Sequence, residues 1–155
     1  MPNKITFRKA NWLDCIFLYN LRNKPETYKY FRNNYPVDFF DHLKWFSGLM
    51  ANKSDKKLFV VFVDGKRAGQ IRFDKIESNK AEISISILKE LMGKHVMSSV
   101  FPEAAKSYLK ENKSVKTLIA PIRKDNTASI NFFRKFGFKK SGEKENWLIY
   151  SKAIK

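Results

Sequence analysis

Residues 81–138 constrain the fold of this chain more than any other stretch, because they order several elements in close succession. Alternating apolar residues predict a strand at 81–88, and a loop that contains Gly93 follows it. A stripe of apolar residues at helical spacing then predicts a helix that ends near Asn112. After a buried strand at 117–122 comes a cluster of helix-capping residue types. Helix-opening amides point into such a loop, so the sequence predicts an anion-binding cradle there.

The N-terminal third predicts one strand and two helices. A strand at 4–8 precedes a helix that Asn11 caps and that stops near Pro25, since a residue before proline resists the α conformation. Its expected apolar face consists of Leu13, Ile16, Phe17 and Leu21, widened by Trp12, Cys15 and Tyr19. After an irregular aromatic connection, a second helix is expected at 38–50, capped by Asp38. Its apolar face is expected to consist of Phe39, Leu43, Phe46 and Met50.

The middle of the chain predicts an antiparallel hairpin. The apolar run at 58–63 is a central strand, Asp64 and Gly65 form a hairpin turn, and the chain returns at 66–76. Residues 139–155 supply two further strands, whose inward-facing residues are expected to be Trp147, Ile149 and Tyr150. This order of elements predicts an α+β fold in a single domain, 1–155, because neither a repeat nor a linker interrupts it.

The net charge limits the classes of partner. The chain holds 31 lysines and arginines against 15 aspartates and glutamates, a balance of +16 that attracts polyanions. The lysines are spread along the whole sequence without a long basic run or an arginine-rich arm, so nucleic acid is not the expected partner. A polyanionic small molecule such as coenzyme A or a nucleotide-sugar would be attracted by the same field.

The cysteine content and the hydropathy indicate the compartment. Cys15 is the single cysteine, so no internal disulfide forms, and with only His42 and His95 beside it no zinc site is expected. No stretch approaches the roughly 18 apolar residues of a membrane span, and the N-terminal apolar run is too short for a signal peptide. We expect a cytoplasmic protein without a metal or a membrane partner.

Residues 126–138 read Asn-Thr-Ala-Ser-Ile-Asn-Phe-Phe-Arg-Lys-Phe-Gly-Phe. This stretch resembles the end of the GNAT superfamily of acyl-CoA-dependent N-acetyltransferases, which often read Asn-x-x-(Ala/Ser)-Ile-x-x-(Tyr/Phe)-x-Lys-x-Gly-Phe. Residues 21–27 are similar to the opening of GNAT proteins that acetylate ribosomal proteins and amino sugars. The resemblance implies a mixed, mostly antiparallel sheet of six to seven strands flanked by about four helices. It also implies direct transfer of acetyl from acetyl-CoA to a primary amine.

The same resemblance implies where acetyl-CoA binds. Backbone groups of the fourth strand, around Ile85, Ile87 and Leu88, would hold the pantetheine arm. The pyrophosphate would lie on the loop after that strand, formed by Gly93, Lys94, His95, Val96 and Met97. The start of the last helix would line the thiol channel with Asn126, Ser129 and Phe133, while Arg123, Lys124 and Arg134 are candidates for the adenosine phosphates. The Asn126 position is also explained as a helix cap without any ligand.

Two features of this region depart from the family pattern. Family members often read (Arg/Gln)-Gly-x-Gly-x-(Gly/Ala) in the phosphate loop, whereas 92–97 keeps only the first glycine and a cation. Its bulky residues are expected to weaken close approach to the phosphates. In addition, Pro102 lies within the predicted helix, so this helix is either kinked there or begins near Ser99, away from the loop.

The candidate catalytic residues are few. Glu82 is the best general base, because alternation places it on one strand face with Ser84 and Ser86. The alternatives are a surface carboxylate paired with a lysine, and a water chain that takes the proton. The general acid of the family is often a tyrosine at the position of Phe133, which cannot donate. Tyr150 then becomes the candidate, with Ser84 and His95 as alternatives.

The acceptor site is expected between the first two helices and the sheet. The candidate side chains combine basic, polar and aromatic types, namely Arg22, Tyr28, Arg32, His42, Trp45 and Ser84. The resemblance favours a nucleotide-linked amino sugar as the small-molecule amine acceptor. A ribosomal or other protein N-terminus, or a non-catalytic acyl-CoA-binding or interaction role, are the alternatives. The sequence does not fix the oligomeric state, and a monomer and a homodimer both stay open.

Overall fold

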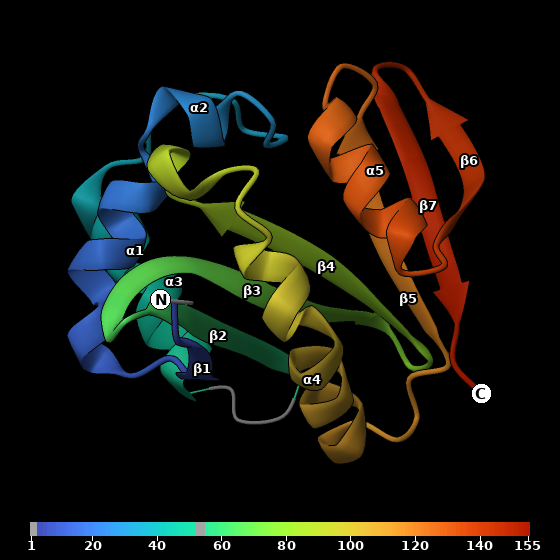
Figure 1. The fold of residues 1–155 in the computed structure, drawn as a ribbon, viewed down its shortest axis with the longest axis horizontal. Helices are drawn as coiled ribbons and strands as arrows, with labels where there is room; N and C mark the ends of the chain where they lie inside the picture. The colour runs from blue at the N-terminus through green and yellow to red at the C-terminus, as the bar shows by residue number, and fades with distance from the viewer. Residues whose placement is uncertain (1–2, 52–54) are drawn as a thin grey trace.

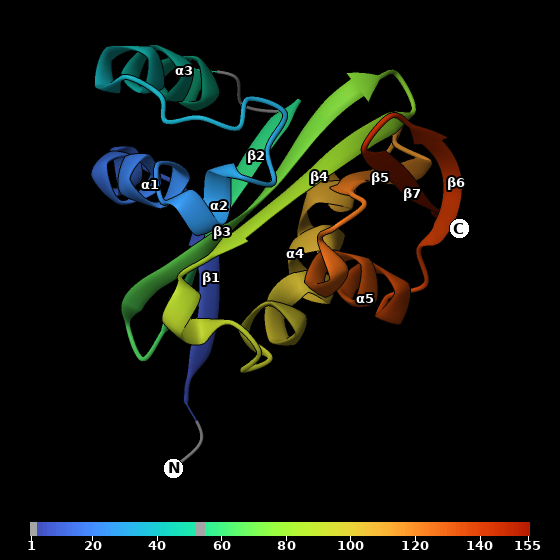
Figure 2. The same cartoon turned by 90° about the horizontal axis from the view of Figure 1, so that it is seen from above.

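The computed structural model describes residues 3–51 and 55–155 and folds them into one seven-stranded sheet with helices on both faces (Figures 1 and 2). The strands are β1 (Ile5–Lys9), β2 (Lys56–Val63), β3 (Lys66–Glu77), β4 (Lys80–Ile87), β5 (Thr117–Arg123), β6 (Lys139–Lys144) and β7 (Trp147–Ala153). The helices are α1 (Cys15–Arg22), α2 (Pro25–Tyr28), α3 (Phe39–Ala51), α4 (Val96–Glu111) and α5 (Thr127–Lys135), with short 3-10 helices at Trp12–Asp14 and Lys89–Leu91.

The strand order is β1-β2-β3-β4-β5-β7-β6, and β4–β5 is the one parallel pair in the described part of the chain. This confirms the α+β class and the mixed, mostly antiparallel sheet. The described residues form five α-helices where about four were expected, because the four-residue helix α2 follows directly on α1. Pro25 stands at the first turn of α2, where its fixed φ and missing N–H are tolerated.

The hairpin between β2 and β3 forms where the sequence predicts it. Asp64 and Gly65 both adopt positive φ, at 50° and 79°, which matches the twist of a tight antiparallel hairpin. Further along β3, a Cβ atom on Gly69 would lie 2.3 Å from the Ser86 carbonyl oxygen and 2.5 Å from Met97 Cε. Only glycine therefore allows β4 and the first turn of α4 to approach β3 so closely.

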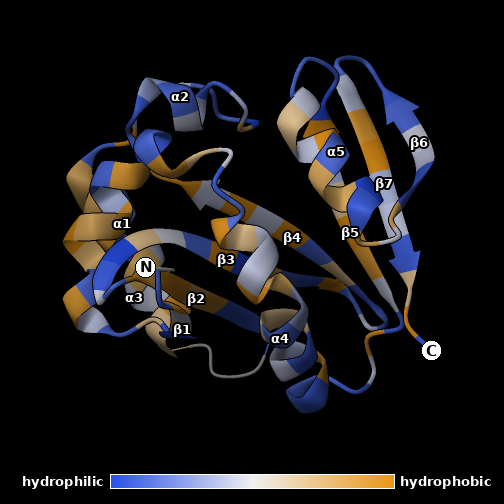
Figure 3. Ribbon diagram, viewed as in Figure 1, coloured by the Kyte–Doolittle hydropathy of each residue, from blue (hydrophilic) through white to orange (hydrophobic). Residues whose placement is uncertain are grey.

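Two apolar cores lie on opposite faces of the sheet (Figure 2). The larger core packs α4 and α5 against β2 to β5 and β7, and Phe73 of β3 stacks on Tyr108 of α4 at 4.7 Å. The smaller core packs α1 and α3 against β2 through Leu18, Phe46 and Val60. Figure 3 shows apolar residues concentrated in β2 and α1, whereas the edge strand β6 is largely hydrophilic.

The apolar face predicted for the first helix is confirmed at Cys15 and Leu21 and wrong at Trp12, Leu13 and Ile16. Leu13 and Ile16 are 80% and 57% exposed, and the buried residues are Cys15, Leu18 and Leu21. The helix begins as a 3-10 turn capped by Asn11, as predicted, but the third residue of that turn is the fully buried Asp14. Ion pairs from Arg8 and Arg67 hold the Asp14 carboxylate inside, and this anchor sets the rotation of α1.

The apolar face predicted for the second helix is also rotated. Asp38 accepts a hydrogen bond from the Phe40 amide, as a cap does, but the buried residues of α3 are His42, Phe46 and Leu49. His42 takes the central position because its ring nitrogen Nε2 hydrogen-bonds the Cys15 carbonyl oxygen at 3.0 Å. A buried histidine with a backbone partner can thus replace an apolar residue in the stripe.

Helix α4 begins at Val96 and continues through Pro102, so the alternative in which it begins near Ser99 is wrong. Proline removes the hydrogen bond that residue 102 would donate to the Ser98 carbonyl, yet the helix extends to Glu111. The buried residues Val96, Val100, Phe101, Ala104 and Tyr108 anchor the helix on both sides of the proline. The positive end of the helix dipole therefore lies beside Gly93, as an anion cradle requires.

Candidate active site

The parallel strands β4 and β5 meet at one end and then diverge. They pair at only three positions, Lys80 with Thr117, Ala81 with Leu118 and Glu82 with Ile119. Beyond Glu82, residues 83–87 stay paired with β3 but not with β5. Figure 1 shows the two strands separating toward the start of α4 on one side and α5 on the other. The edge of β4 that faces β5 is therefore left with backbone groups that can bind a ligand.

The loop before α4 has the geometry of an anion cradle. Gly93 and His95 adopt positive φ, at 77° and 60°, and no side chain caps the helix that follows. The His95 carbonyl accepts bonds from the Ser99 amide and from the Ser99 hydroxyl at 2.7 Å, which closes the first helical turn. The first amides of α4 thus remain as donors, and Lys94, exposed in the loop, adds a cation.

Two of the bulky residues of this loop, Val96 and Met97, do not point into the cradle, whereas Met92 and His95 are exposed. Val96 and Met97 are 4% and 6% exposed, and both belong to the core beneath α4. Met97 lies over Gly69, where a Cβ atom would meet its terminal methyl group at 2.5 Å. Their side chains therefore fasten the helix start to the sheet, and the cradle presents backbone groups instead.

The opposite side of the divergence carries the start of α5. Asn126 caps this helix, and its Oδ1 accepts a hydrogen bond from the Ser129 amide at 3.3 Å. Both residues are half-buried at the end of β5. Phe133 is 4% exposed and packs in an aromatic cluster with Phe101 and Phe138. It is therefore a core residue beneath α5.

A polar band crosses β3 and β4 on the face toward α1 and α3. Register places three pairs side by side, Gln70 with Ser86, Arg72 with Ser84 and Asp74 with Glu82. Gln70 Nε2 donates to Ser86 Oγ at 3.1 Å, and Arg72 Nε donates to Asp74 Oδ2 at 3.0 Å. Two buried atoms of the band, Gln70 Oε1 and Asp74 Oδ1, have no hydrogen-bond partner within the described residues. The predicted alternation of β4 is confirmed, because Ile83, Ile85 and Ile87 belong to the core of the other face.

Glu82 lies where β4 leaves β5, and it is paired with an arginine. Arg32 Nη1 lies 3.1 Å from Glu82 Oε1, and Arg32 Nη2 donates to Oε2 at 3.3 Å. Arg32 comes from the connection between α2 and α3, and its Cζ lies 6.0 Å from the ring centroid of Trp147 on β7. Arg123 of β5 lies over the same indole at 5.8 Å. This connection thus reaches across the divergence from β4 to β7.

The candidates on the first two helices separate into structural and accessible groups. Arg22 donates to the Asn33 carbonyl at 2.7 Å and to the Tyr35 carbonyl at 3.3 Å, so it holds the connection in place. Burial, together with the charge of Arg72, lowers the pKa of Arg22. His42 is 4% exposed, and burial lowers its pKa. Trp45 is half-buried and lies 5.3 Å from the Arg72 guanidinium, so it borders the polar band.

The remaining candidates lie at different places. Tyr150 is 2% exposed beneath α5, with the Arg134 guanidinium 6.0 Å from its ring, and is part of the same core as Phe133. Ser84 is half-buried in the polar band, and the His95 side chain is exposed in the phosphate loop. Tyr28 is half-buried at the end of α2. The structure thus brings Ser84, Trp45, Arg32 and Glu82 together, but not Tyr150.

Sequence reasoning missed the β3 half of the polar band and the indole at its edge. Gln70, Arg72 and Asp74 alternate with Gly69, Ile71 and Phe73, in a strand whose central position predicts burial on both faces. Polar residues at every second position of such a strand were the available signal. Trp147 was expected to pack inward, and it instead lies half-buried between Arg32 and Arg123.

Residues 3–51 and 55–155 contain no group of three or more histidine, cysteine, aspartate or glutamate side chains that could hold a metal ion. None of the helices in these ranges is both long and apolar enough to cross a membrane.

Comparison with known proteins shows which family has this fold and site. The acetyltransferase (GNAT) domain matches residues 4–139. Acetyltransferase PseH of Campylobacter jejuni is 27% identical over 132 residues, which cover 85% of this chain and 81% of that protein. A domain from Methanocaldococcus jannaschii has a TM-score of 0.84 at 26% identity, covering 99% of this chain and 100% of that one. The C. jejuni N-acetyltransferase PseH in complex with acetyl coenzyme A has a TM-score of 0.73 at 22% identity, and the match covers 98% of this chain and 100% of that one. The chain therefore belongs to the GNAT family of acetyltransferases.

Proposed function

We propose that this acetyltransferase moves acetyl from acetyl-CoA to the primary amine of a nucleotide-linked amino sugar in a direct ternary complex in the cytoplasm. The observation that supports an amine as the acceptor is the carboxylate pair Asp74 and Glu82. They are register partners on β3 and β4, and like charges placed directly opposite destabilise a sheet unless a cation compensates. Arg72 and Arg32 each bind one of the carboxylates, but the buried Asp74 Oδ1 has no partner within the described chain. An acceptor ammonium would provide the missing donor.

Acetyl-CoA is the acyl donor of the family, and its thioester supplies the carbonyl that the amine attacks. The residues on the β4 side fit this substrate. The first amides of α4 and the Lys94 ammonium would hold the pyrophosphate, and the free edge of β4 at Ile85 and Ile87 would pair with the amide groups of the pantetheine arm. Leu88 could contribute only its carbonyl, because its amide already donates to the Ala68 carbonyl at 2.9 Å. Asn126 and Ser129 would border the arm from the α5 side. None of these roles depends on a bulky side chain of the loop.

The divergence sets the direction in which the donor would lie. The phosphate end belongs at the start of α4, and the thioester end belongs near the last β4–β5 pair at Glu82. Ile87 lies five positions after Glu82 along β4, which is roughly 16 Å at the usual rise of a strand. The reacting carbonyl would therefore lie beside the carboxylate pair, and free amides of β4 would stabilise its developing negative charge.

Glu82 is the proposed acceptor of the amine proton, directly or through a water molecule. Both of its oxygens contact Arg32, whose side chain is 64% exposed, so the remaining lone pairs of Glu82 face the acceptor. Asp74, deeper in the band, would orient the ammonium by accepting a hydrogen bond at Oδ1. Tyr150 would take part only if the cores around α5 rearranged, so we leave protonation of the leaving thiolate to the departing amine proton or to water.

The nucleotide half of the acceptor is proposed from the cations and indoles around the carboxylate pair. Arg32 and Arg123 border the indole of Trp147, and Arg72 borders Trp45. Guanidinium groups bind diphosphates, and an indole face can stack on a base. A simple amine or a peptide N-terminus has neither a diphosphate nor a base to use these groups.

The test compares acceptors in an assay of thiol release from acetyl-CoA. We expect turnover with a nucleotide-linked amino sugar, and a much higher KM for the same sugar without its nucleotide. Asp74→Asn should raise the acceptor KM about ten- to hundred-fold, the cost of a hydrogen bond to a charged group, and leave the KM for acetyl-CoA unchanged. Asp41→Asn, which changes an exposed carboxylate on α3, is the matched control.

Each part of the proposal can fail separately. Faster turnover with ribosomal N-terminal peptides than with any amino sugar would overturn the acceptor class. An unchanged acceptor KM in Asp74→Asn would remove the carboxylate pair from the site. Acetyl-CoA binding by calorimetry without thiol release toward any acceptor would indicate a non-catalytic acyl-CoA-binding domain, and the absence of both would overturn the acetyl-CoA site itself.

A further inference from the structure

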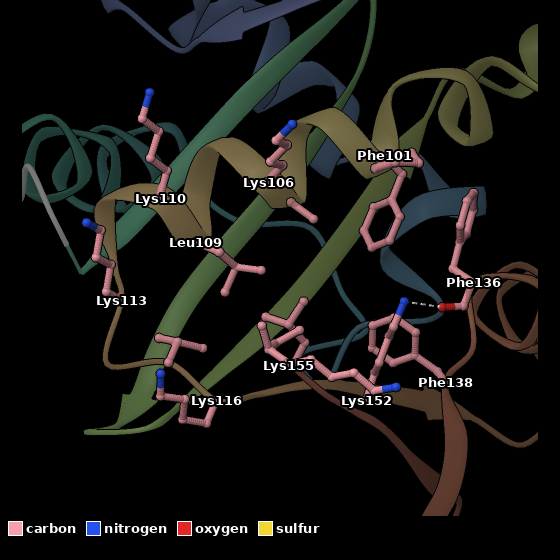
Figure 4. Close-up of a pocket in the computed structure, with 15 residues that line it drawn as sticks. Phe101, Lys106, Leu109, Lys110, Lys113, Lys116, Phe136, Phe138, Lys152 and Lys155 are labelled. Carbon is pink, nitrogen blue, oxygen red and sulfur yellow. Dashed lines mark hydrogen bonds between the residues drawn. The ribbon is translucent and has the colours of Figure 1, made fainter.

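A cavity lies at the end of α4 opposite the phosphate loop, on the face away from the polar band. It has a volume of about 660 Å³ and runs between the C-terminal half of α4 and the ends of β5 and β7. Its floor is apolar and consists of Phe101, Ala105, Leu109, Leu118, Phe138 and Ile154. Six lysines form its rim, namely Lys106, Lys110, Lys113, Lys116, Lys152 and Lys155. Figure 4 shows these lysines around Leu109 and the rings of Phe101 and Phe138.

The rim lysines lack acidic partners, unlike many lysines elsewhere on the molecule. Lys9, Lys57, Lys124 and Lys140 each pair with a glutamate, whereas no ion pair to a described carboxylate involves any rim lysine. Glu111, on the same helix, faces Lys9 and Lys57 on the other side of α4. The Lys152 ammonium donates to the Phe136 carbonyl, which is the one described hydrogen bond of this side chain. The groove therefore concentrates uncompensated positive charge around an apolar floor.

The same feature is visible in the sequence of α4. One stripe of this helix, with Val100, Ala104 and Tyr108, is buried against the sheet. A second stripe, with Ala105 and Leu109, is half-buried and faces the groove between lysines. An exposed helix face normally carries polar residues only, so a second apolar stripe flanked by cations indicates a binding surface.

We propose that this groove, defined by its six rim lysines and apolar floor, binds an acidic amphipathic helix of a partner protein. From Phe101 to Glu111, where α4 ends, the helix rises roughly 15 Å, which matches about three turns of a docked helix. Leucine-like residues at i, i+3, i+4 and i+7 of the partner would contact the floor, and carboxylates on both flanks would face the rim. Charge complementarity on both sides of an apolar seam selects this class of ligand.

Three other occupants fit the groove less well. A single-stranded nucleic acid would need exposed rings for stacking, but two of the three rings that line the groove, Phe101 and Phe138, are 3% and 2% exposed and pack on one another at 6.4 Å. A lipid surface is flat, whereas this site is concave. A second copy of the chain would bring its own +16 charge against the six lysines, and like charges repel.

The site is separate from the acetyl-CoA cradle. Val96 opens α4 at the cradle and Lys110 lies at the groove, about 21 Å apart along the helix. Substitutions on the rim should therefore leave acetyl-CoA binding unchanged, which serves as a check that each variant is folded.

The experiment uses a fluorescein-labelled synthetic peptide of about four helical turns, with leucines on one face and glutamates on both flanks. Binding is followed by fluorescence anisotropy, with a scrambled peptide of the same composition as the control ligand. We expect the amphipathic peptide to bind the full chain and to weaken with added salt. The double variant Lys106→Glu with Lys110→Glu should weaken binding at least about ten-fold, and Leu109→Ala about three- to ten-fold.

The matched control variant is Lys44→Glu with Lys66→Glu, which reverses the same charge on α3 and at the start of β3 and should change binding less than about two-fold. Equal binding of the scrambled peptide, or an equal loss in both double variants, would reduce the effect to net charge and overturn the proposal. Tighter, rim-dependent binding of single-stranded oligothymidine or of equimolar phosphatidylcholine and phosphatidylglycerol vesicles would overturn it in favour of those ligands.

Discussion

Asp14 provides the sharpest test of how α1 is fixed against the sheet. Its carboxylate is fully buried and accepts bonds from Arg8 Nη1 at 2.7 Å, Arg8 Nη2 at 3.0 Å, Arg67 Nε at 2.8 Å and the Asn11 amide at 2.8 Å. Asp14→Asn keeps the shape but replaces an accepting oxygen with a donating NH₂ group and removes the charge. The substituted amide would then face a guanidinium with which it cannot bond.

The expected loss follows from these contacts. A hydrogen bond to a charged group contributes about 1.5–3 kcal/mol, and the substitution removes two or more of them. Arg8 and Arg67 are 39% and 33% exposed, so they regain water and the loss is discounted by roughly half. We therefore expect the free energy of unfolding to fall by about 2–4 kcal/mol. For a chain of 155 residues this lowers Tm by about 5–15 °C.

The pH dependence supplies an independent check. Burial alone would raise the pKa of Asp14, but the bonds from Arg8, Asn11 and Arg67 outweigh it and hold the pKa below its ordinary value of 3.8. A carboxyl with a lowered folded-state pKa stabilises the protein above its unfolded pKa, and this contribution is lost as the pH falls below that value. The difference in the free energy of unfolding between wild type and Asp14→Asn, measured in urea, should thus be largest near neutral pH and should shrink below about pH 4.

The reasoning would be refuted by a gap under about 1 kcal/mol at neutral pH, or by a gap that does not narrow in acid. Asp41→Asn removes an exposed carboxylate from α3 and should leave the stability unchanged within about 0.5 kcal/mol.

Three further predictions concern the same framework. Gly69→Ala should cost about 1–3 kcal/mol, since its Cβ would meet Ser86 backbone at 2.3 Å, while Gly48→Ala, with open space around its Cβ, should be neutral or stabilising in thermal melts. Burial lowers the pKa of His42, so stability should be full above its ordinary value of 6.5 and fall below it, and His42→Leu should remove this slope in urea titrations. His95→Gly should relieve the positive φ and hold or raise acetyl-CoA affinity by calorimetry, whereas Met97→Gly should lower stability by about 2–5 kcal/mol.

The elements that the sequence predicts well are those set by local chemistry. The turn at Asp64 and Gly65 and the caps at Asn11, Asp38 and Asn126 lie where predicted, because each depends on a few adjacent residues. The alternation of apolar and polar residues along β4 could also be predicted from the sequence, because one face of the strand belongs to the core. These elements position the phosphate loop and the start of α5 without any long-range information.

The rotation of α1 about its axis could not be predicted from the sequence, because it depends on contacts between residues that are far apart in the chain. Asp14 is buried only because Arg67, 53 positions later, and Arg8 both reach it. A helical-periodicity argument assumes that charged residues face solvent, so it turned Leu13 and Ile16 inward. The carboxylate pair of Asp74 and Glu82 was missed for a related reason, since their proximity is created by the β3–β4 register.

The phosphate loop shows why counting glycines underestimates a cradle of this kind. An anion cradle needs backbone amides that converge, and convergence depends on φ and ψ more than on side-chain size. Here Gly93 adopts positive φ freely, and His95 adopts it at a cost of about 1 kcal/mol because Val96 and Met97 pin the following helix to the sheet. The two bulky residues that looked like obstacles thus have a structural use, since they are the contacts that hold the helix start beside Gly69. The burial of Val96 and Met97 therefore supports a working coenzyme site. These two residues differ from the family motif, but the difference affects how α4 packs on the sheet and leaves the surface that the phosphates would contact unchanged.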